Sequence, residues 1–278
     1  MNMPNKGVWR ILFVGDVVGR VGRKLLRETL PALRQEHQPW TVIVNGENSA
    51  GGLGIQEKSA RELMEAGADL ITTGNHVWDK KQEAISLFEK GHCPIIRPVN
   101  FPEGVPGSGT WVIKGPEGRE GLVVNLMGRV FMEPVADNPF RAMERLLAET
   151  TLPVALVDFH GEASAEKMAM GFFLDGKVGA VLGTHTHVPT LDTRILPQGT
   201  AYQTDVGMTG PLDSIIGMET GPIIQKFLTG IHHRFQVAKG PMTLDFTVVD
   251  LDVATMKAIR ACSFRKTGAE PVSVPSVS

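Results

Sequence analysis

The sequence predicts an α/β protein built around a largely parallel β-sheet. Three times within the first hundred residues, a short apolar run ends in a polar loop and gives way to a helical pattern. Such alternation is typical of βαβ units, in which helices connect parallel strands. Hydrophobic residues make up 42% of the 278 positions, which is enough apolar material for one large core.

The elements of the first hundred residues follow from their hydrophobic periodicity. The strands are short runs of β-branched and apolar residues, as expected for strands buried on both faces. The helices carry apolar residues three or four positions apart, with charged residues between them. In chain order we expect strand Val8–Val14, helix Arg20–His37, strand Trp40–Val44, helix Gln56–Ala66 and strand Asp69–Thr72.

The rest of the chain is expected to be richer in strands. The predicted strands are Thr110–Lys114, Leu122–Leu126, Pro153–Asp158, Lys177–Leu182, Thr193–Leu196, Gly199–Gln203 and Leu244–Asp252, with a helix at Phe140–Glu149. No Pro/Ser-rich linker divides the sequence. We therefore expect a single domain over residues 1–265, followed by a flexible polar tail over 266–278 that packs on nothing.

Composition excludes several classes of protein. The chain has 28 Lys and Arg against 30 Asp and Glu, a formal net charge of -2. This balance argues against a protein that wraps long nucleic acid but is compatible with a small phosphorylated substrate. The two cysteines, Cys93 and Cys262, form no metal-binding or disulfide pattern, which suits a reducing cytoplasm. Because we find no signal peptide and no bilayer-length apolar run, we expect a soluble, cytoplasmic protein with no membrane partner.

Polar clusters follow five of the predicted strands. They are Asp16, Glu47 with Asn48, Asn75 with His76, His160, and His185 with His187. Taken singly, each has an ordinary explanation: an Asp caps a helix, an Asn forms a turn, and a His packs in a core. Ligands of open α/β sheets, however, bind at the carboxyl ends of the strands. The clusters therefore predict one shared site.

The residue types in this shared site point to transition metals. In an extended segment His185 and His187 point to the same side, so both can reach a shared ion. Mixed nitrogen and oxygen donors suit Zn, Mn or Fe rather than Ca or Mg. The clusters also offer more donors than one tetrahedral ion takes, so two neighbouring ions are the simplest arrangement.

The ordered motifs resemble those of calcineurin-like metallophosphoesterases. They are Gly15-Asp16, Gly46-Glu47-Asn48, Gly74-Asn75-His76, His160 and Gly183-Thr184-His185-Thr186-His187. The nearer resemblance is to the YmdB-like branch, through FVGDVVGRVGR, NGENSAGGLGI, DLITTGNHVWD, NLMGRVFM, DFHGEASAEK and AYQTDVGMTGPLDSIIG. It extends from Ile11 to Phe264. The resemblance implies a four-layer α/β sandwich, in which helices flank two facing mixed β-sheets and a dinuclear metal site lies between the loops.

The resemblance also implies a ligand set. By position, Asp16, Glu47 and His187 would hold one ion, and Glu47, Asn75, His160 and His185 the other, with Glu47 bridging them. Asn48 would be a further ligand or a phosphate contact. The implied cofactors are two divalent or trivalent transition-metal ions per chain, Fe or Mn first and Zn as an alternative.

Three motifs depart from the wider superfamily. Val18 stands where a histidine ligand usually follows the aspartate two residues on, and Gly46-Glu47-Asn48 stands where most members have Gly-Asp with a further Asp. Val77 follows His76 in place of the usual acidic partner, although Asp79 is close in sequence. The first two changes belong to the branch pattern, and the third leaves the orientation of His76 without an explanation.

The activity that the resemblance implies is that of a metal-dependent phosphodiesterase acting on small phosphodiesters or nucleotides, including 2′,3′-cyclic nucleotides. Our hypothesis for the mechanism is that a hydroxide bridging the two metal ions attacks phosphorus. His76 would act as general acid, because an alkoxide leaves poorly unless it is protonated. Short RNA could also enter such a site, and a homo-oligomer is compatible with the resemblance because related proteins often associate.

For several neighbouring residues the sequence leaves two interpretations open. One of Asp158, Glu162 and Glu166 could hold a ligand imidazole, or all three could lie at a solvated helix start. Arg129 could bind phosphate or form an ordinary salt bridge. The segment Thr204–Gly217 could form a pocket wall or be tightly turned backbone. The candidate contacts of such a wall are Asp205, Thr209 and Ser214.

Three other functions compete with this interpretation. A dinucleotide-binding turn at Gly15, Gly19 and Gly22 has the wrong spacing and leaves the histidines without a role. A metal-bound nucleotide sensor with little turnover would need the same ligands as an enzyme. A phosphatase or nuclease would act on another phosphoester at the same site.

Overall fold

Two β-sheets form the centre of the computed structural model, which describes residues 7–267 and 270–273. The first contains β1 (Val8–Val14), β2 (Asp16–Val17), β3 (Thr41–Asn45), β4 (Leu70–Thr72), β11 (Met208–Pro211), β12 (Met242–Asp252), β13 (Ala258–Thr267) and β14 (Glu270–Ser273). The main strand order is β14-β13-β12-β1-β3-β4, and β11 pairs with β12 and β2. Strands β1, β3 and β4 are parallel, and β12 runs antiparallel to β1.

The second sheet is also mixed. It contains β5 (Thr110–Lys114), β6 (Glu120–Met127), β7 (Val154–His160), β8 (Ala180–Thr184), β9 (Arg194–Ile195) and β10 (Ala201–Gln203). The order is β5-β6-β7-β8-β10-β9, with parallel pairing from β6 to β10 and antiparallel strands at both edges. The carboxyl ends of the parallel strands in each sheet carry the polar clusters.

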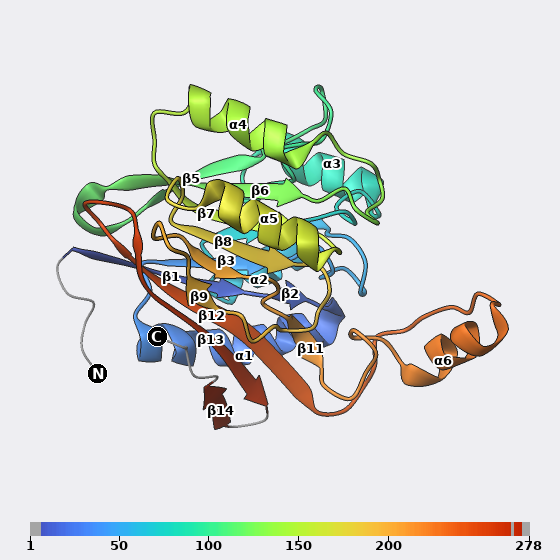
Figure 1. The fold of residues 1–278 in the computed structure, drawn as a ribbon. Helices are drawn as coiled ribbons and strands as arrows, with labels where there is room; N and C mark the ends of the chain where they lie inside the picture. Colours follow the sequence, from blue (N-terminus) through green and yellow to red (C-terminus); the bar gives the residue numbers. More distant parts are fainter. Residues whose placement is uncertain (1–6, 268–269, 274–278) are drawn as a thin grey trace.

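Helices cover the outer faces of the two sheets (Figure 1). They are α1 (Gly19–His37), α2 (Glu57–Glu65), α3 (Lys81–Lys90), α4 (Pro139–Glu149) and α5 (Ser164–Leu174). A sixth helix, α6 (Thr220–Thr229), lies apart from the sheets, and a 3₁₀ turn lies at Pro116–Gly118. The apolar side chains of α1 and α2 pack on the first sheet, and those of α4 and α5 pack on the second. The layers are therefore helix, sheet, sheet, helix.

Successive side chains along a strand point to opposite faces of its sheet and so pack in different layers. In β1, Ile11 and Phe13 join an apolar cluster that includes Val123 of β6, whereas Leu12 joins the cluster beneath α1. Since side chains of one strand serve both faces, the strands read as continuous apolar runs. The fold class predicted from the sequence, an α/β sandwich in which helices flank two facing mixed sheets, is confirmed.

The structure differs from the sequence prediction at several elements. The sequence patterns do not predict α3, α5, α6, β11 or β13. The prediction that the chain from residue 266 packs on nothing is wrong for residues 266–267 and 270–273. Lys266 and Thr267 belong to β13, and Glu270–Ser273 pairs with that strand as β14. Residues 268–269 and 274–278 of the predicted tail lie outside the described residues.

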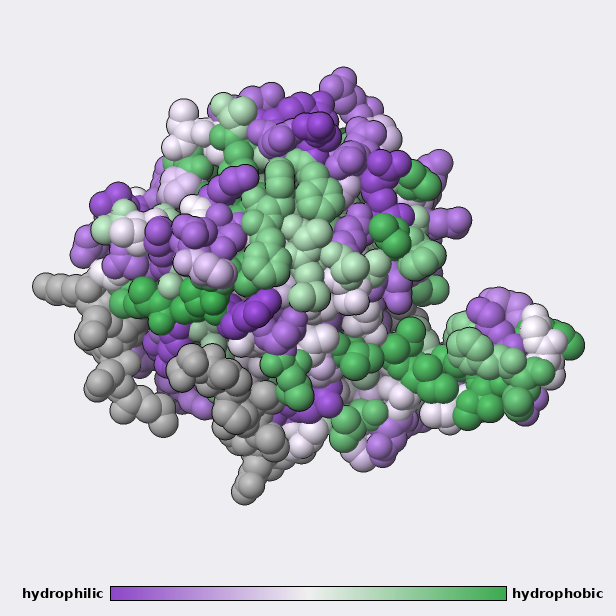
Figure 2. All heavy atoms as spheres, in the orientation of Figure 1, coloured by the Kyte–Doolittle hydropathy of each residue, from purple (hydrophilic) through white to green (hydrophobic). Residues whose placement is uncertain are grey.

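A projecting arm carries α6 away from the body of the molecule (Figure 1). Its base is closed by backbone bridges from Met218 to Ile215 and Val237. Apolar side chains gather on its surface (Figure 2), where Phe227 is 82% exposed and Leu228 73%. Within the described chain, none of the helices combines the length and apolar character needed to cross a bilayer.

Candidate functional site

The predicted polar clusters converge at the carboxyl edges of the two sheets. Asp16 lies in β2 just after β1, Glu47 and Asn48 follow β3, Asn75 and His76 follow β4, His160 ends β7, and His185 and His187 follow β8. The fold therefore brings residues 16 to 187 of the chain into one site. Within it the donors divide into a first group, Glu47, Asn75, His160 and His185, and a second group, Asp16, Asn48 and His187.

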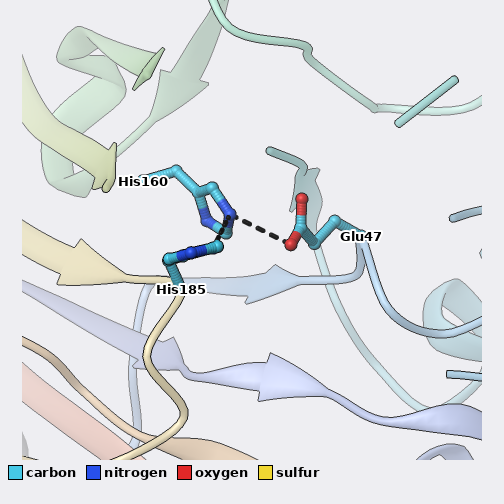
Figure 3. A group of neighbouring side chains, drawn as sticks. All are labelled: Glu47, His160 and His185. Atoms are coloured by element: carbon cyan, nitrogen blue, oxygen red, sulfur yellow. Dashed lines mark hydrogen bonds and ion pairs between the residues drawn. The ribbon is translucent and has the colours of Figure 1, made fainter. Parts of the chain in front are cut away.

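The first group surrounds Nε2 of His160. This nitrogen lies 3.0 Å from Glu47 Oε1, 3.0 Å from Asn75 Oδ1 and 3.1 Å from His185 Nδ1. Figure 3 shows Glu47, His160 and His185 pointing toward one another, and their ligand atoms all lie within 4.8 Å. Donors around one tetrahedral ion with bonds of about 2.1 Å lie about 3.4 Å apart. The first group could therefore hold a metal ion after small adjustments.

Hydrogen bonds fix the ring of His160 for this role. Its Nδ1 lies 2.9 Å from the hydroxyl of Thr184, which donates its only proton to Asp158 Oδ1 at 2.7 Å. The hydroxyl must therefore accept from Nδ1–H, which leaves Nε2 facing Glu47. Burial raises the pKa of Asp158 to about 6. Asp158 is thus linked to His160 by hydrogen bonds through Thr184.

His185 is oriented by a carboxylate. Its Nε2 lies 3.1 Å from Glu162 Oε2, so its Nδ1 is the nitrogen that faces His160. Its backbone N–H donates to Asp16 Oδ2 at 3.1 Å, which ties the loop after β8 to the second group. Glu162 is therefore the predicted acidic neighbour that contacts a candidate ligand directly.

The second group is more open. His187 donates from Nδ1 to the carbonyl of Ile216 at 2.8 Å, which leaves Nε2 facing Asn48 Nδ2 at 3.0 Å and Asp16 Oδ1 at 3.7 Å. Asn48 also donates to Glu47 Oε1 at 3.1 Å and so joins the two groups. Among the described residues, Asp16 Oδ1 is buried and has no hydrogen-bond partner. An unpartnered buried carboxylate oxygen is costly, and a cation beside it would remove that cost.

Charges inside the site favour a cation. Burial opposes ionisation of Asp16 and Glu47, but the neighbouring imidazoles outweigh it and hold the pKa of both carboxyls below the ordinary range. Burial also opposes the charged form of His187, yet Asp16 raises its pKa to about 9. Burial and the charge of His160 lower the pKa of His185 to about 3. The donor set thus fits metal ions: two ionised carboxylates with imidazole nitrogens beside them.

Close packing at Gly74 and an unusual backbone complete the site. A Cβ on Gly74 would lie 2.2 Å from Glu47 Oε2 and 2.4 Å from His160 Nε2, so only glycine fits there. His185 and His187 have φ values of 105° and 64°, which non-glycine residues rarely adopt. Such conformations cluster at functional sites and need support from their surroundings.

His76 lies at the rim of this site. Its Nδ1 is 2.9 Å from Asp79 Oδ2, and its backbone N–H donates to Glu47 Oε2 at 3.2 Å. With Glu47, Asn48, Glu162, His185 and His187 it lines a pocket of about 380 Å³. Asp79, three residues further along the chain, therefore supplies the acidic partner whose absence from position 77 left His76 without an explanation.

Other predicted neighbours have structural contacts. Both carboxylate oxygens of Glu166 accept the backbone N–H of Arg129, and one also accepts that of Val130, so this acid holds a loop and not a ligand. Ser214 donates to the carbonyl of Pro211 inside a turn. Thr209 lies buried in β11.

The segment Thr204–Gly217 contributes Ile216 to the pocket, and not Asp205, Thr209 or Ser214. Asp205 lies beneath the loop that carries the two histidines, where it accepts the N–H of Thr186 and pairs with Lys167. Sequence reasoning missed Thr184 and Lys167 as supports of the site. Both stand inside the quoted motifs, but only the fold reveals their partners.

The glycines after β1 serve close packing of backbone. A Cβ on Gly15 would lie 2.2 Å from the carbonyl oxygen of Gly207, and one on Gly22 would lie 2.3 Å from that of Thr209. Because these glycines lack a Cβ, the backbone around β11 can pack directly against them. The dinucleotide-binding alternative would need the same glycines to face a pyrophosphate.

Comparisons with known proteins agree on one family. The model of the family described as YmdB-like protein matches residues 12–263. A Bacillus subtilis (strain 168) protein named 2′,3′-cyclic-nucleotide 2′-phosphodiesterase is 49% identical over 253 residues, covering 90% of this chain and 94% of that protein.

Solved structures agree with the sequence comparisons. A hypothetical protein from Thermus thermophilus has a TM-score of 0.86 at 44% identity, covering 93% of this chain and 99% of its own. A structure described as a novel phosphatase, from Mycoplasma pneumoniae, has a TM-score of 0.87 at 35% identity and covers 94% of both chains.

Proposed function

Because the chain belongs to the YmdB-like protein family, we propose that it is a metal-dependent phosphodiesterase whose substrates are small phosphodiesters, 2′,3′-cyclic nucleotides above all. The observation that carries this proposal is the convergence of two carboxylates, two carboxamides and three imidazoles beside one pocket. The name of the Bacillus subtilis relative supports the choice of substrate.

We propose that the two groups of donors each hold one metal ion. Glu47 would bridge them, since its Oε1 lies near both His160 of the first group and Asn48 of the second. The mixture of nitrogen and oxygen donors supports Fe or Mn, with Zn as an alternative. When bound, such ions supply Lewis-acid activation of water and neutralise charge on a phosphoryl group.

In this proposal the side chains divide the remaining work. Asn48 presents its amide nitrogen to the second group, so it would orient the substrate phosphate and leave the second ion to Asp16, Glu47 and His187. His76, with a proton on each ring nitrogen, would donate a hydrogen bond from Nδ1 to Asp79 and transfer the Nε2 proton to the leaving ribose oxygen. Leu53, Val188 and Met218 would exclude water from the apolar side of the pocket.

The cytoplasm is the location that we propose. The chain has two cysteines, Cys93 and Cys262, and both are free thiols. Burial raises the pKa of the Cys93 thiol to about 11, which keeps it in the unreactive protonated form. Such usage supports a reducing compartment.

The test is hydrolysis of 2′,3′-cyclic AMP by the purified protein, before and after metal removal by a chelator. We expect chelation to abolish turnover and Mn²⁺ or Fe²⁺ to restore it, while His92→Ala, a histidine outside the pocket, keeps wild-type turnover. Tight binding of the nucleotide without turnover under any metal would support the sensor alternative. Turnover of a phosphomonoester alone would make the protein a phosphatase.

A further inference from the structure

We propose that the buried ion pair Lys167–Asp205 is a positioning device that holds the loop carrying His185 and His187 in its ligand-presenting conformation. The inference rests on the proposed function only in taking these two histidines as metal ligands. The pair lies beneath the loop and not in the pocket.

The pair binds backbone groups on both sides of His185. Lys167 Nζ, from α5, lies 2.7 Å from Asp205 Oδ2 and 2.7 Å from the carbonyl oxygen of Thr184. The same Asp205 oxygen accepts the backbone N–H of Thr186 at 3.0 Å. Oδ1 of Asp205 accepts the N–H of Gly207 at 2.9 Å, which anchors the carboxylate to the next segment.

Three consecutive residues, from the end of β8 into the loop, are thus held by charged side chains. Lys167 binds the carbonyl of Thr184, Asp16 accepts the N–H of His185, and Asp205 accepts the N–H of Thr186. This segment contains the unusual φ of 105° at His185 and leads into the φ of 64° at His187. A backbone of this kind persists only where several contacts determine it.

The burial of the pair needs an explanation beyond stability. Lys167 is 1% exposed and Asp205 is fully buried, and lysine is almost never buried to this degree unless it is paired. Removing two charges from water is expensive, and apolar residues of similar volume often stabilise a fold equally well or better. The other partners of both charges are backbone groups of the loop and its flank. A role in fixing that backbone therefore explains the pair better than a role in stability.

The loop serves both donor groups, so its position affects both. His185 directs Nδ1 to His160 in the first group, and His187 directs Nε2 to Asp16 and Asn48 in the second. A shift of the peptide between residues 184 and 186 would move one imidazole in each group. Loss of the pair is therefore expected to weaken binding of both ions together.

The test measures metal binding and not only turnover. Metal-free wild type, Lys167→Met and Asp205→Asn are titrated with Co²⁺, and its visible absorption spectrum reports the ligand geometry. We expect the wild type to bind two equivalents. In both variants we expect affinity to fall about 10- to 100-fold, with an altered spectrum, as for other residues that orient metal ligands.

A double variant separates positioning from folding. Because a single substitution leaves one buried charge unpaired, Lys167→Met or Asp205→Asn could unfold the protein. Lys167→Met/Asp205→Leu removes both charges. We expect it to keep a melting temperature close to that of the wild type and still to bind Co²⁺ about tenfold more weakly. Arg10→Met/Asp250→Leu, which removes both charges of a remote ion pair, is the matched control and should keep full affinity.

Wild-type affinity and spectrum in a folded double variant would overturn the positioning role. A wild type that binds Co²⁺ but hydrolyses no cyclic nucleotide would overturn the proposed function and leave the positioning role intact. A wild type that binds no Co²⁺ would overturn both the metal centre and the positioning role that depends on it.

Discussion

The two donor groups of the site differ in how closely their candidate ligand atoms converge. In the first group, His160 Nε2 has three partner atoms at 3.0–3.1 Å, and Thr184 and Glu162 hold the other nitrogens of its two rings. In the second group, Asp16 Oδ1 is 3.7 Å from His187 Nε2 and, within the described chain, has no hydrogen-bond partner.

This difference indicates which group has its candidate ligands preorganised for a metal ion. The two rings of the first group are held from outside, by Thr184 and Glu162, so that their free nitrogens face Glu47 and Asn75 before an ion enters. The second group leaves a buried carboxylate oxygen unsatisfied, so an ion would complete it. We therefore expect the first group to bind its ion more tightly, and the second ion to exchange more readily. The predictions that follow test this ranking, beginning with the largest effect.

Glu47→Gln is expected to have the largest effect, because Glu47 Oε1 joins the two groups. Loss of its charge should weaken both ions together and lower kcat/KM for 2′,3′-cyclic AMP by about 10³-fold or more, equivalent to about 4 kcal/mol. Metal content by mass spectrometry is the companion measurement. Glu57→Gln on α2, away from the site, should change neither value. If Glu47→Gln retained both ions, the proposed bridging role of Glu47 would be wrong.

Asp16→Asn should separate the two groups. The carboxylate of Asp16 raises the pKa of His187, its partner in the second group, to about 9. Asp16 also accepts the backbone N–H of His185, a contact that the amide oxygen of Asn can keep. We expect the variant to keep one ion per chain, in the first group, and to lose about 10²- to 10³-fold in kcat/KM. Measured stoichiometry decides the matter: loss of both ions would show that the first group is not preorganised.

His76→Ala should separate metal binding from proton transfer, since His76 belongs to neither group. We expect two ions per chain and a fall in kcat of about 10²-fold, the lower part of the range for general acid catalysis. Asp79→Asn should lower kcat by less, because it only orients the ring. A substrate with a good leaving group, such as a nitrophenyl phosphodiester, needs no protonation and should be hydrolysed at nearly the wild-type rate by His76→Ala. Equal losses on both substrates would exclude the general acid role.

Much of the fold was predictable, because buried strands have a direct signature. The run Val8–Val14 serves two apolar clusters at once, so it reads as continuous hydrophobic sequence. Helix α5 gives no such signal, since it buries Lys167 and exposes Phe172. In α6 a single residue, Ile223, is buried, so its apolar residues follow no core-facing pattern. Hydrophobic periodicity predicts a helix or strand only where the apolar side chains are the ones that are buried.

The sequence was enough to predict the candidate ligands of the site, but not the residues that hold those ligands in place. Strand ends of a parallel sheet meet at one edge, so Asp16, Glu47 and His160 could be assigned to one site from sequence. The support that Thr184 gives to His160, and that Lys167 gives to the loop after β8, depends on contacts between segments far apart in the chain. Asp205, a candidate for the pocket wall on sequence grounds, lies instead beneath that loop.

Glu162→Gln should give the smallest effect and compares how the two groups orient their rings. In the second group the ring of His187 is held by the backbone carbonyl of Ile216, which no substitution removes. In the first group the ring of His185 is held by Glu162, whose side chain is 48% exposed and therefore well screened by water. We expect about tenfold weaker binding of one ion, unchanged binding of the other, and a modest rise in KM for metal. Glu166 lies about one turn further along the same segment and accepts the backbone N–H of Arg129 instead of contacting a candidate ligand. Glu166→Gln is therefore the matched control. If Glu162→Gln instead weakened the ion of the second group, the division of the site into two separately oriented halves would be wrong.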